Sequence, residues 1–122
     1  PSVRTNDCYK YYVVFITPIM TNVINLRRFP YDVYIGRPGR GEEGFFGNSH
    51  PIGWCNICNQ THNRTESVAA FKKEFLYRIE NDAEFRKRVI ELKGKTLGCF
   101  CKPLSCHGDV IADWLDNQPN LQ

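Results

Sequence analysis

The sequence predicts an α/β protein of one domain, in which helices pack on a small mixed sheet in Rossmann-like layers. Three observations support this prediction. Short β-rich segments precede two segments with the apolar period of helices, and a further strand and helix follow them. The 122 residues are enough for one domain with a modest core. The composition, 42% hydrophobic and 24% charged, is ordinary for a globular chain and does not indicate disorder.

The first two strands are expected at residues 23–27 and 31–35. The first segment is rich in strand-forming residues, and apolar residues alternate with polar or small ones in the second. Because only residues 28–30 connect them, we predict that the two strands pair as a hairpin. Residues 36–44 contain four glycines and a proline, so they form a loop.

Two helices are expected after this loop. Apolar residues recur at helical spacing from Asn63 onward, and Asn63 and Glu66 have the spacing of a capping box. Asn81 and Asp82 interrupt the apolar pattern, so a second helix starts there, and Gly94 ends it.

The segment 97–107 holds three of the six cysteines and one of the three histidines. Alternation places Cys99 and Cys101 on one face of a strand. Pro103 stops that strand, and Ser105 can cap the final helix that follows it. Thiol and imidazole groups are therefore expected to meet at one strand-to-helix turn.

The start of the final helix is a candidate catalytic site. The helix dipole and the free N–H groups there lower the pKa of a thiol such as Cys106, and His107 or Asp109 can act as acid or base. The same N–H groups can bind an anion beside Ser105, with Arg37 as a natural companion.

The cysteines of this segment allow two other interpretations. Some of Cys99, Cys101 and Cys106 can ligate a metal ion with tetrahedral geometry. Alternatively, they serve as small apolar residues of the core.

A second group of metal-ligating residues lies in the middle of the chain. Cys55 and Cys58 form a C-x-x-C turn, His62 follows, and His50 lies slightly upstream. Two thiolates and a histidine at this spacing predict a structural zinc ion. A redox dithiol would need a strand-to-helix context that is missing here. One metal ion shared with the C-terminal cysteines is a further alternative.

The domain is expected to span residues 20–117, with the Cys/His group as an insert at 50–62. Residues 1–19 are expected to be an extension or to carry an extra strand, and 118–122 a polar tail. The longest apolar stretch, residues 11–20, is too short to span a bilayer, so no membrane association is expected.

The net charge and the number of cysteines indicate the kind of partner and the cellular compartment. The formal charge of +3 does not demand a nucleic acid, but it permits a phosphate-bearing partner. No signal-peptide pattern opens the sequence, so six cysteines predict a reducing cytoplasm rather than a disulfide scaffold.

Several motifs together resemble one known family. They are Asn22-Val-Ile-Asn-Leu-Arg27, Asp32-Val-Tyr-Ile-Gly-Arg-Pro38, Gly47-Asn48 and the segment 92–109 with its C-x-C-x-P-x-x-C-H-G-D pattern. Over about residues 20–116 the chain resembles a small, widespread domain-of-unknown-function family of bacteria and their phages. Ser49 departs from an expected proline, and the Cys55–His62 insert is a feature of only some members. The resemblance implies a phage accessory protein in the host cytoplasm, and no particular activity.

The predicted ligand is a nucleotide-like or phosphate-bearing small molecule. Arg37 would hold its phosphate, Asn48 would orient it, and Cys99 and Cys101 would contribute to the pocket. His107 with Asp109 would carry any proton transfer of a nucleotide-processing enzyme. A phage decoy that sequesters a nucleotide signal would bind without turnover.

The rival hypothesis is a module, stabilised by a structural zinc ion, that binds a nucleic acid or a host protein without catalysis. Its phosphate contacts would come from basic residues across the chain: Arg27, Arg28, Arg40, Arg64, Lys72 and Lys73.

Overall fold

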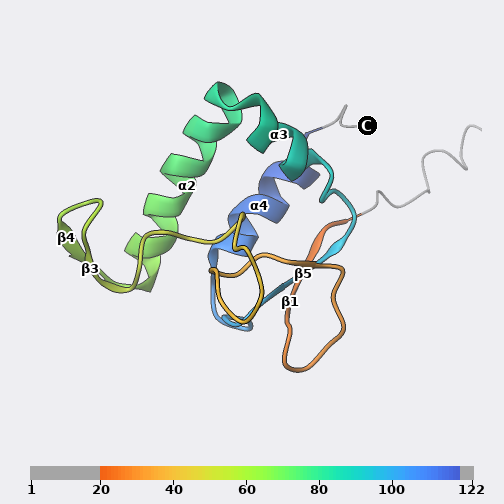
Figure 1. The fold of residues 1–122 in the computed structure, drawn as a ribbon, viewed down its shortest axis with the longest axis horizontal. Coiled ribbons are helices and arrows are strands. Elements are labelled where there is room, and N and C mark those ends of the chain that lie inside the picture. Colours follow the sequence, from red (N-terminus) through yellow and green to blue (C-terminus); the bar gives the residue numbers. More distant parts are fainter. Residues whose placement is uncertain (1–19, 119–122) are drawn as a thin grey trace, which may run out of the picture.

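The computed structural model describes residues 20–118, so the predicted extension or strand in 1–19 and most of the tail lie outside the described part. Strands and helices follow one another as Figure 1 shows. Their bounds are β1 Asn22–Asn25, β2 Val33–Tyr34, β3 Gly53–Cys55, β4 Gln60–His62, α2 Arg64–Asn81, α3 Ala83–Ile90, β5 Thr96–Cys99 and α4 His107–Asp116.

The main sheet has the strand order β1-β5-β2, and both outer strands run parallel to β5. The predicted hairpin of 23–27 with 31–35 is therefore wrong. The physical reason is the apolar character of β5, whose Leu97, Gly98 and Cys99 are all buried. A strand buried on both faces belongs in the centre of a parallel sheet, where two neighbours cover its edges.

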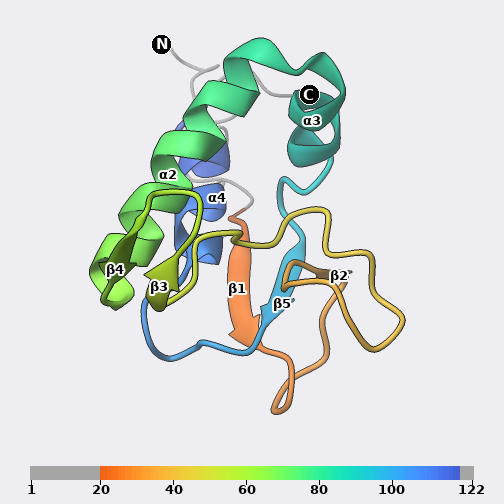
Figure 2. The same cartoon turned by 60° about the vertical axis from the view of Figure 1, so that its left-hand side comes forward.

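A separate antiparallel ribbon consists of β3 and β4. It contacts α2 and lies beside the first turns of that helix in both views (Figures 1 and 2). The parallel and antiparallel pairings, with three helices in the described range, confirm a small α/β fold. No helix within 20–118 combines the length and the apolar character that crossing a bilayer requires.

The helix boundaries follow from local capping. The predicted box at Asn63 is confirmed: the Glu66 N–H donates to Asn63 Oδ1, and the Asn63 N–H donates to Glu66 Oε1, both at 2.8 Å. The predicted break after α2 is also present. Asp82 caps α3 by accepting a 3.1 Å hydrogen bond from the Phe85 N–H.

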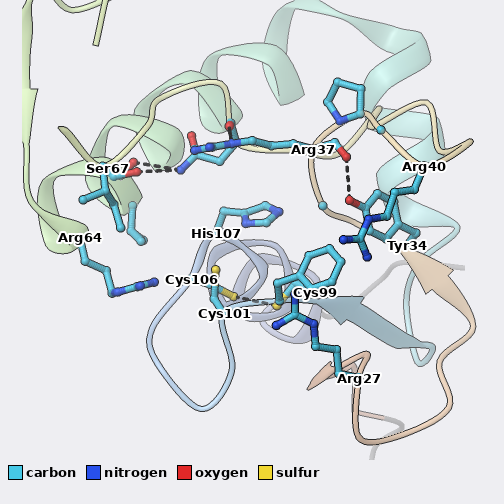
Figure 3. Close-up of a pocket in the computed structure, with 17 residues that line it drawn as sticks. Arg27, Tyr34, Arg37, Arg40, Arg64, Ser67, Cys99, Cys101, Cys106 and His107 are labelled. Atoms are coloured by element: carbon cyan, nitrogen blue, oxygen red, sulfur yellow. Dashed lines mark hydrogen bonds between the residues drawn. The ribbon is translucent and has the colours of Figure 1, made fainter. Parts of the chain in front are cut away.

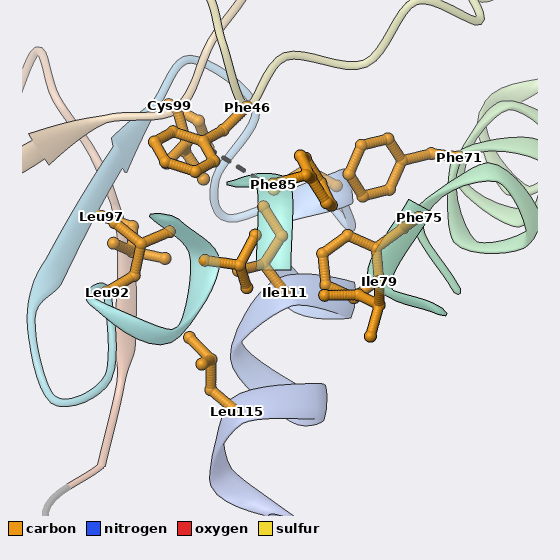
Figure 4. Close-up of a cluster of buried hydrophobic side chains, with 13 residues drawn as sticks. Phe46, Phe71, Phe75, Ile79, Phe85, Leu92, Leu97, Cys99, Ile111 and Leu115 are labelled. Atoms are coloured by element: carbon orange, nitrogen blue, oxygen red, sulfur yellow. Dashed lines mark hydrogen bonds between the residues drawn. The ribbon is translucent and has the colours of Figure 1, made fainter. Parts of the chain in front are cut away.

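The hydrophobic core fills the space between the main sheet and the helices (Figure 4). Phe75 of α2 is 1% exposed and packs edge-on against Phe85 of α3 at a centroid distance of 5.7 Å. Ile111 and Leu115 of α4 and Leu97 of β5 complete this layer. Burial of these side chains fixes α4 against the sheet.

The first turn of α4 approaches the sheet unusually closely. A Cβ on Gly108 would lie 2.8 Å from both Ile35 Cδ1 and Val23 Cγ1. Glycine therefore permits this approach, which a side chain would obstruct. Next to it, His107 Nε2 lies 2.6 Å from the Ile35 carbonyl oxygen, so the helix start is tied to the end of β2.

The loop after β2 folds back so that two backbone segments touch. A Cβ on Gly47 would lie 2.7 Å from the Gly36 carbonyl oxygen and 3.0 Å from Arg37 Cα. These are backbone atoms, which no rotamer change can move away. Residues 36–37 and 47 are thus held against each other.

We predict that Gly47→Ala lowers the free energy of unfolding by about 1–3 kcal/mol, because the added methyl group overpacks against backbone. Urea unfolding followed by circular dichroism measures the loss. Ser49 is exposed in the same loop, and Ser49→Ala should change the stability by less than about 0.5 kcal/mol. Equal stability of the two variants would contradict the close approach.

Candidate functional site

A cavity of about 520 Å³ lies where the three parallel strands end (Figure 3). Arg27 shortly follows β1, Gly36 follows β2, and Cys99 is the last residue of β5; all three line the cavity. The first residues of α4 and α2 form other parts of its wall. The carboxyl edge of a parallel sheet is where ligands commonly bind in α/β proteins.

The charge of the cavity comes from Arg27, Arg37, Arg40 and Arg64, which Figure 3 shows on different sides of it. No Asp or Glu is among the described residues of its wall. Within residues 20–118, none of the four guanidinium groups forms an ion pair with a carboxylate. The cavity therefore presents positive charge that no acid among the described residues neutralises.

Two of these arginines flank an aromatic ring. The Arg27 guanidinium lies 4.9 Å and that of Arg40 5.8 Å from the centroid of Phe100. Tyr34 meets the same ring edge-on at 6.3 Å, and its hydroxyl donates to the Arg37 carbonyl at 2.6 Å. Cation–π attraction thus helps to hold both guanidinium groups at the cavity.

Three thiols meet at the cavity wall. The sulfur atoms of Cys99, Cys101 and Cys106 lie within 4.8 Å of one another, and those of Cys99 and Cys106 are 3.5 Å apart. Hydrogen bonds from Cys106 and Cys99 lower the pKa of Cys101. Donating to Cys101 raises the pKa of Cys106, against the lowering expected at a helix start. The hydrogen bonds within the group therefore favour the loss of a proton from Cys101 over its loss from Cys106.

His107 lines the cavity, but its Nε2 is engaged by the Ile35 carbonyl oxygen at 2.6 Å. That contact requires a proton on Nε2, because a carbonyl only accepts. Burial lowers the pKa of His107, although the Ile35 carbonyl opposes the shift. The ring is thus neutral and has a fixed tautomer, with Nδ1 as an acceptor.

Asp109 and Ser105 do not line the cavity. Asp109 Oδ2 accepts a 3.1 Å hydrogen bond from the Cys106 N–H, and its other oxygen pairs with Lys102 Nζ. Ser105 is exposed, and the helix cap is Cys106 instead of Ser105. Asp109 therefore fixes the start of α4, and the Ser105 carbonyl accepts from Arg64 Nη1 at 3.1 Å.

Asn48 is buried, and both the nitrogen and the oxygen of its side-chain amide form hydrogen bonds within the protein. Its Nδ2 donates to Ser67 Oγ at 3.0 Å, and its Oδ1 accepts from the His50 N–H at 2.8 Å. Its carbonyl accepts from Arg37 Nε at 2.8 Å. Asn48 therefore positions the guanidinium of Arg37 through the backbone, while its side chain ties the loop to α2.

The second group, His50, Cys55, Cys58 and His62, is brought together by the β3–β4 ribbon and the loop before it. The four ligand atoms lie within 4.8 Å of one another. His50 Nδ1 is 3.5 Å from Cys55 Sγ and 3.4 Å from Cys58 Sγ. Tetrahedral zinc with Zn–N of about 2.0–2.1 Å and Zn–S of about 2.3 Å places N and S about 3.6 Å apart.

Two further features fit a metal ion at this group. Both ring nitrogens of His62 are buried and lack a hydrogen-bond partner among the described residues. His50 Nε2 lies 2.6 Å from Glu74 Oε1, which leaves Nδ1 as the ligand atom. Burial raises the pKa of Cys55, but hydrogen bonds from the Cys58 N–H and His50 outweigh it and lower the pKa to about 6. The group could therefore hold a metal ion.

The two groups of potential metal ligands are separate. The alternative of one ion shared between them does not fit, because each group has its own close-set ligand atoms. The C-terminal group lines the cavity. None of the four residues of the other group, which includes His62, lines it. Asn48, between Arg37 and His50, connects the cavity wall to the second group.

Sequence reasoning found only part of the cavity wall. Arg37, Asn48, Cys99, Cys101, Cys106 and His107 do converge there. Arg27 and Arg40 belong to an arginine-rich stretch, residues 27–40, that the sequence predicts can hold an anion, whereas Arg64 was expected only as a nucleic-acid contact. Phe100 was not singled out. The position of Arg27 just after a predicted strand was the available signal, since strand ends meet at one edge.

Comparison with known proteins shows which family and which relative the sequence is similar to. Residues 21–117 match the family model described as "Domain of unknown function (DUF4326)". The chain is 32% identical over 93 residues to an "Uncharacterized 12.4 kDa protein in nrdA-td intergenic region" of Enterobacteria phage T4. That match covers 76% of this chain and 75% of the phage protein. No solved structure matches the chain.

We predict that Glu74→Ala lowers the affinity of the His50 group for zinc by about 10–100-fold, because His50 loses the carboxylate that orients it. Competition with a chromophoric chelator measures the affinity. Glu80 is exposed on the same helix, so Glu80→Ala is the matched control and should leave the affinity unchanged. Equal affinities of the two variants would refute the orienting role of Glu74.

Proposed function

Because the chain belongs to the family described as "Domain of unknown function (DUF4326)", whose description names no activity, we propose its function from the cavity. The protein binds a small phosphate-bearing, nucleotide-like molecule there. A structural zinc ion at His50, Cys55, Cys58 and His62 stabilises the neighbouring wall. The similarity to a phage T4 protein supports a role as a phage accessory protein.

The observation that carries this proposal is the convergence of four arginines on one cavity without an acidic neighbour in its described wall. Arginine binds phosphate oxygens through paired N–H groups of fixed geometry. A volume of about 520 Å³ suits a small molecule. The ring of Phe100, 36% exposed, offers a surface on which a base can stack.

The distribution of basic residues supports a small ligand over an extended nucleic acid. Of the residues considered for nucleic-acid contacts, Arg27, Arg40 and Arg64 line the same cavity. Lys72 and Lys73 are exposed on α2 and do not line it. A polymer needs a continuous basic surface, whereas a cavity concentrates charge on a single phosphate group.

The zinc ion would act structurally because its four protein ligands complete a tetrahedral shell. Its effect reaches the cavity through hydrogen bonds: the His50 N–H donates to Asn48 Oδ1, and Ser67 Oγ donates to the His50 carbonyl at 2.5 Å. Asn48 in turn accepts from Arg37. Removal of the ion would therefore loosen one phosphate-binding arginine.

Binding, rather than proton transfer, is the function that the polar contacts support. The carboxylate of Asp109 is engaged outside the cavity, and His107 is held by the Ile35 carbonyl. A ligand recovered intact after incubation, analysed by chromatography, would fit a binding or sequestering protein. A chemically changed ligand would instead identify a nucleotide-processing enzyme.

We predict that Arg27→Gln weakens binding of inorganic pyrophosphate about tenfold or more, since a charged hydrogen bond contributes about 1.5–3 kcal/mol. Isothermal titration calorimetry measures the dissociation constant. Arg28 is the adjacent arginine but lies outside the cavity wall, so Arg28→Gln should change the constant less than twofold. Equal weakening by both variants would favour a diffuse basic surface, and absence of pyrophosphate and nucleotide binding would refute the proposal.

A further inference from the structure

We propose that Cys99, Cys101 and Cys106 bind a second zinc ion, whose fourth coordination position is open toward the arginine-lined cavity and takes an oxygen of the phosphate-bearing ligand. The part concerning the ligand rests on the proposed function. The metal site itself does not, because it depends only on the three thiols.

The three thiols are held at their places by different structural elements. Cys99 ends β5, Cys101 follows in the loop, and Cys106 caps α4. Their sulfur atoms lie within 4.8 Å of one another, with 3.5 Å between Cys99 and Cys106. One tetrahedral zinc ion with Zn–S bonds of about 2.3 Å separates its sulfur ligands by about 3.8 Å. Only small movements are therefore needed to accommodate a single ion.

The described part of the chain supplies no fourth ligand to this group. The neighbouring imidazole of His107 is the nearest in sequence, but its Nε2 is engaged by the Ile35 carbonyl, and it does not belong to the close-set ligand atoms. Asp109 caps the helix and pairs with Lys102. Three protein ligands and one free position are the arrangement of zinc sites that exchange ligands, in contrast to closed structural sites.

The free position would face the cavity. All three cysteines line it, and Figure 3 shows their sulfur atoms beside His107, between Arg64 on one side and Arg27 on the other. A phosphate group that binds the ion through one oxygen would thus keep its other oxygens close to the guanidinium groups. Zinc and arginine would recognise the same anion from different sides.

Metal content of the full chain tests the first part of the inference. The wild-type protein is purified under reducing conditions in the presence of zinc. Native mass spectrometry should then find two zinc ions per chain. Cys101 is half-buried beyond the end of β5, so Cys101→Ser should fold, as circular dichroism can verify, and retain one ion. Cys58→Ser, also half-buried, is the matched control that removes the other ion. One ion in the wild type, or a Cys99–Cys106 disulfide formed under reducing conditions, would overturn the inference.

Cobalt substitution tests the open position. Inorganic phosphate should shift the visible absorption bands of Cys58→Ser loaded with one Co²⁺, and it should leave those of Cys101→Ser loaded with one Co²⁺ unchanged. Arg27→Gln in the Cys58→Ser background should retain the ion but require about tenfold more phosphate for the same shift. No shift in the Cys58→Ser protein and none in the wild type loaded with two Co²⁺ would overturn the open position.

Calorimetry with inorganic phosphate separates this inference from the proposed function. If Cys101→Ser binds phosphate as tightly as the wild type, the cavity binds anions and the metal–ligand contact is refuted. If no variant and no wild-type protein binds phosphate, pyrophosphate or nucleotide while two zinc ions are present, the proposed function fails and the three-thiol metal site stands.

Discussion

The arrangement of the candidate site depends on how closely α4 approaches the carboxyl edge of the sheet. Gly108 lets the helix start within van der Waals reach of Val23 and Ile35, and His107 donates to the Ile35 carbonyl. This contact brings Cys106 next to Cys99 at the end of the central strand. Without it the three thiols would not share one wall of the cavity. Packing at one glycine thus determines which side chains meet at this wall of the cavity.

A second dependence links the cavity to the β3–β4 ribbon. Asn48 donates to Ser67 and accepts from the His50 N–H, while its own carbonyl accepts from Arg37. One buried residue therefore joins the loop that carries the potential metal ligand His50, the first turns of α2 and the guanidinium of Arg37. Buried polar groups are costly when unpaired, so the hydrogen bonds of the Asn48 side chain hold the loop against α2. The ribbon thereby supports the cavity, although none of the potential metal ligands around the ribbon lines the cavity wall.

Local signals in the sequence were sufficient for the helices and for the four ligands around His62, because capping boxes and C-x-x-C turns are encoded within a few residues. Strand pairing was not local: β1 and β2 both pair with β5, about sixty to seventy residues further along the chain. Adjacency in sequence favoured a hairpin, whereas burial of β5, the most buried strand of the main sheet, accounts for the observed topology. The convergence of Arg27 and Arg64 on one cavity is equally non-local, since the two residues meet only after the sheet has formed.

The two groups of cysteine and histidine residues differ in a way that separates their roles. The group around His62 has four donors on a small ribbon and leaves no free position on a tetrahedral ion. The group around Cys106 has three donors at the end of a buried strand, beside arginines that pair with no carboxylate in residues 20–118. Three thiolates outweigh the charge of a zinc ion, and the nearby guanidinium groups offset that excess. A phosphate-bearing ligand would complete both the coordination of the ion and the charge balance of the cavity.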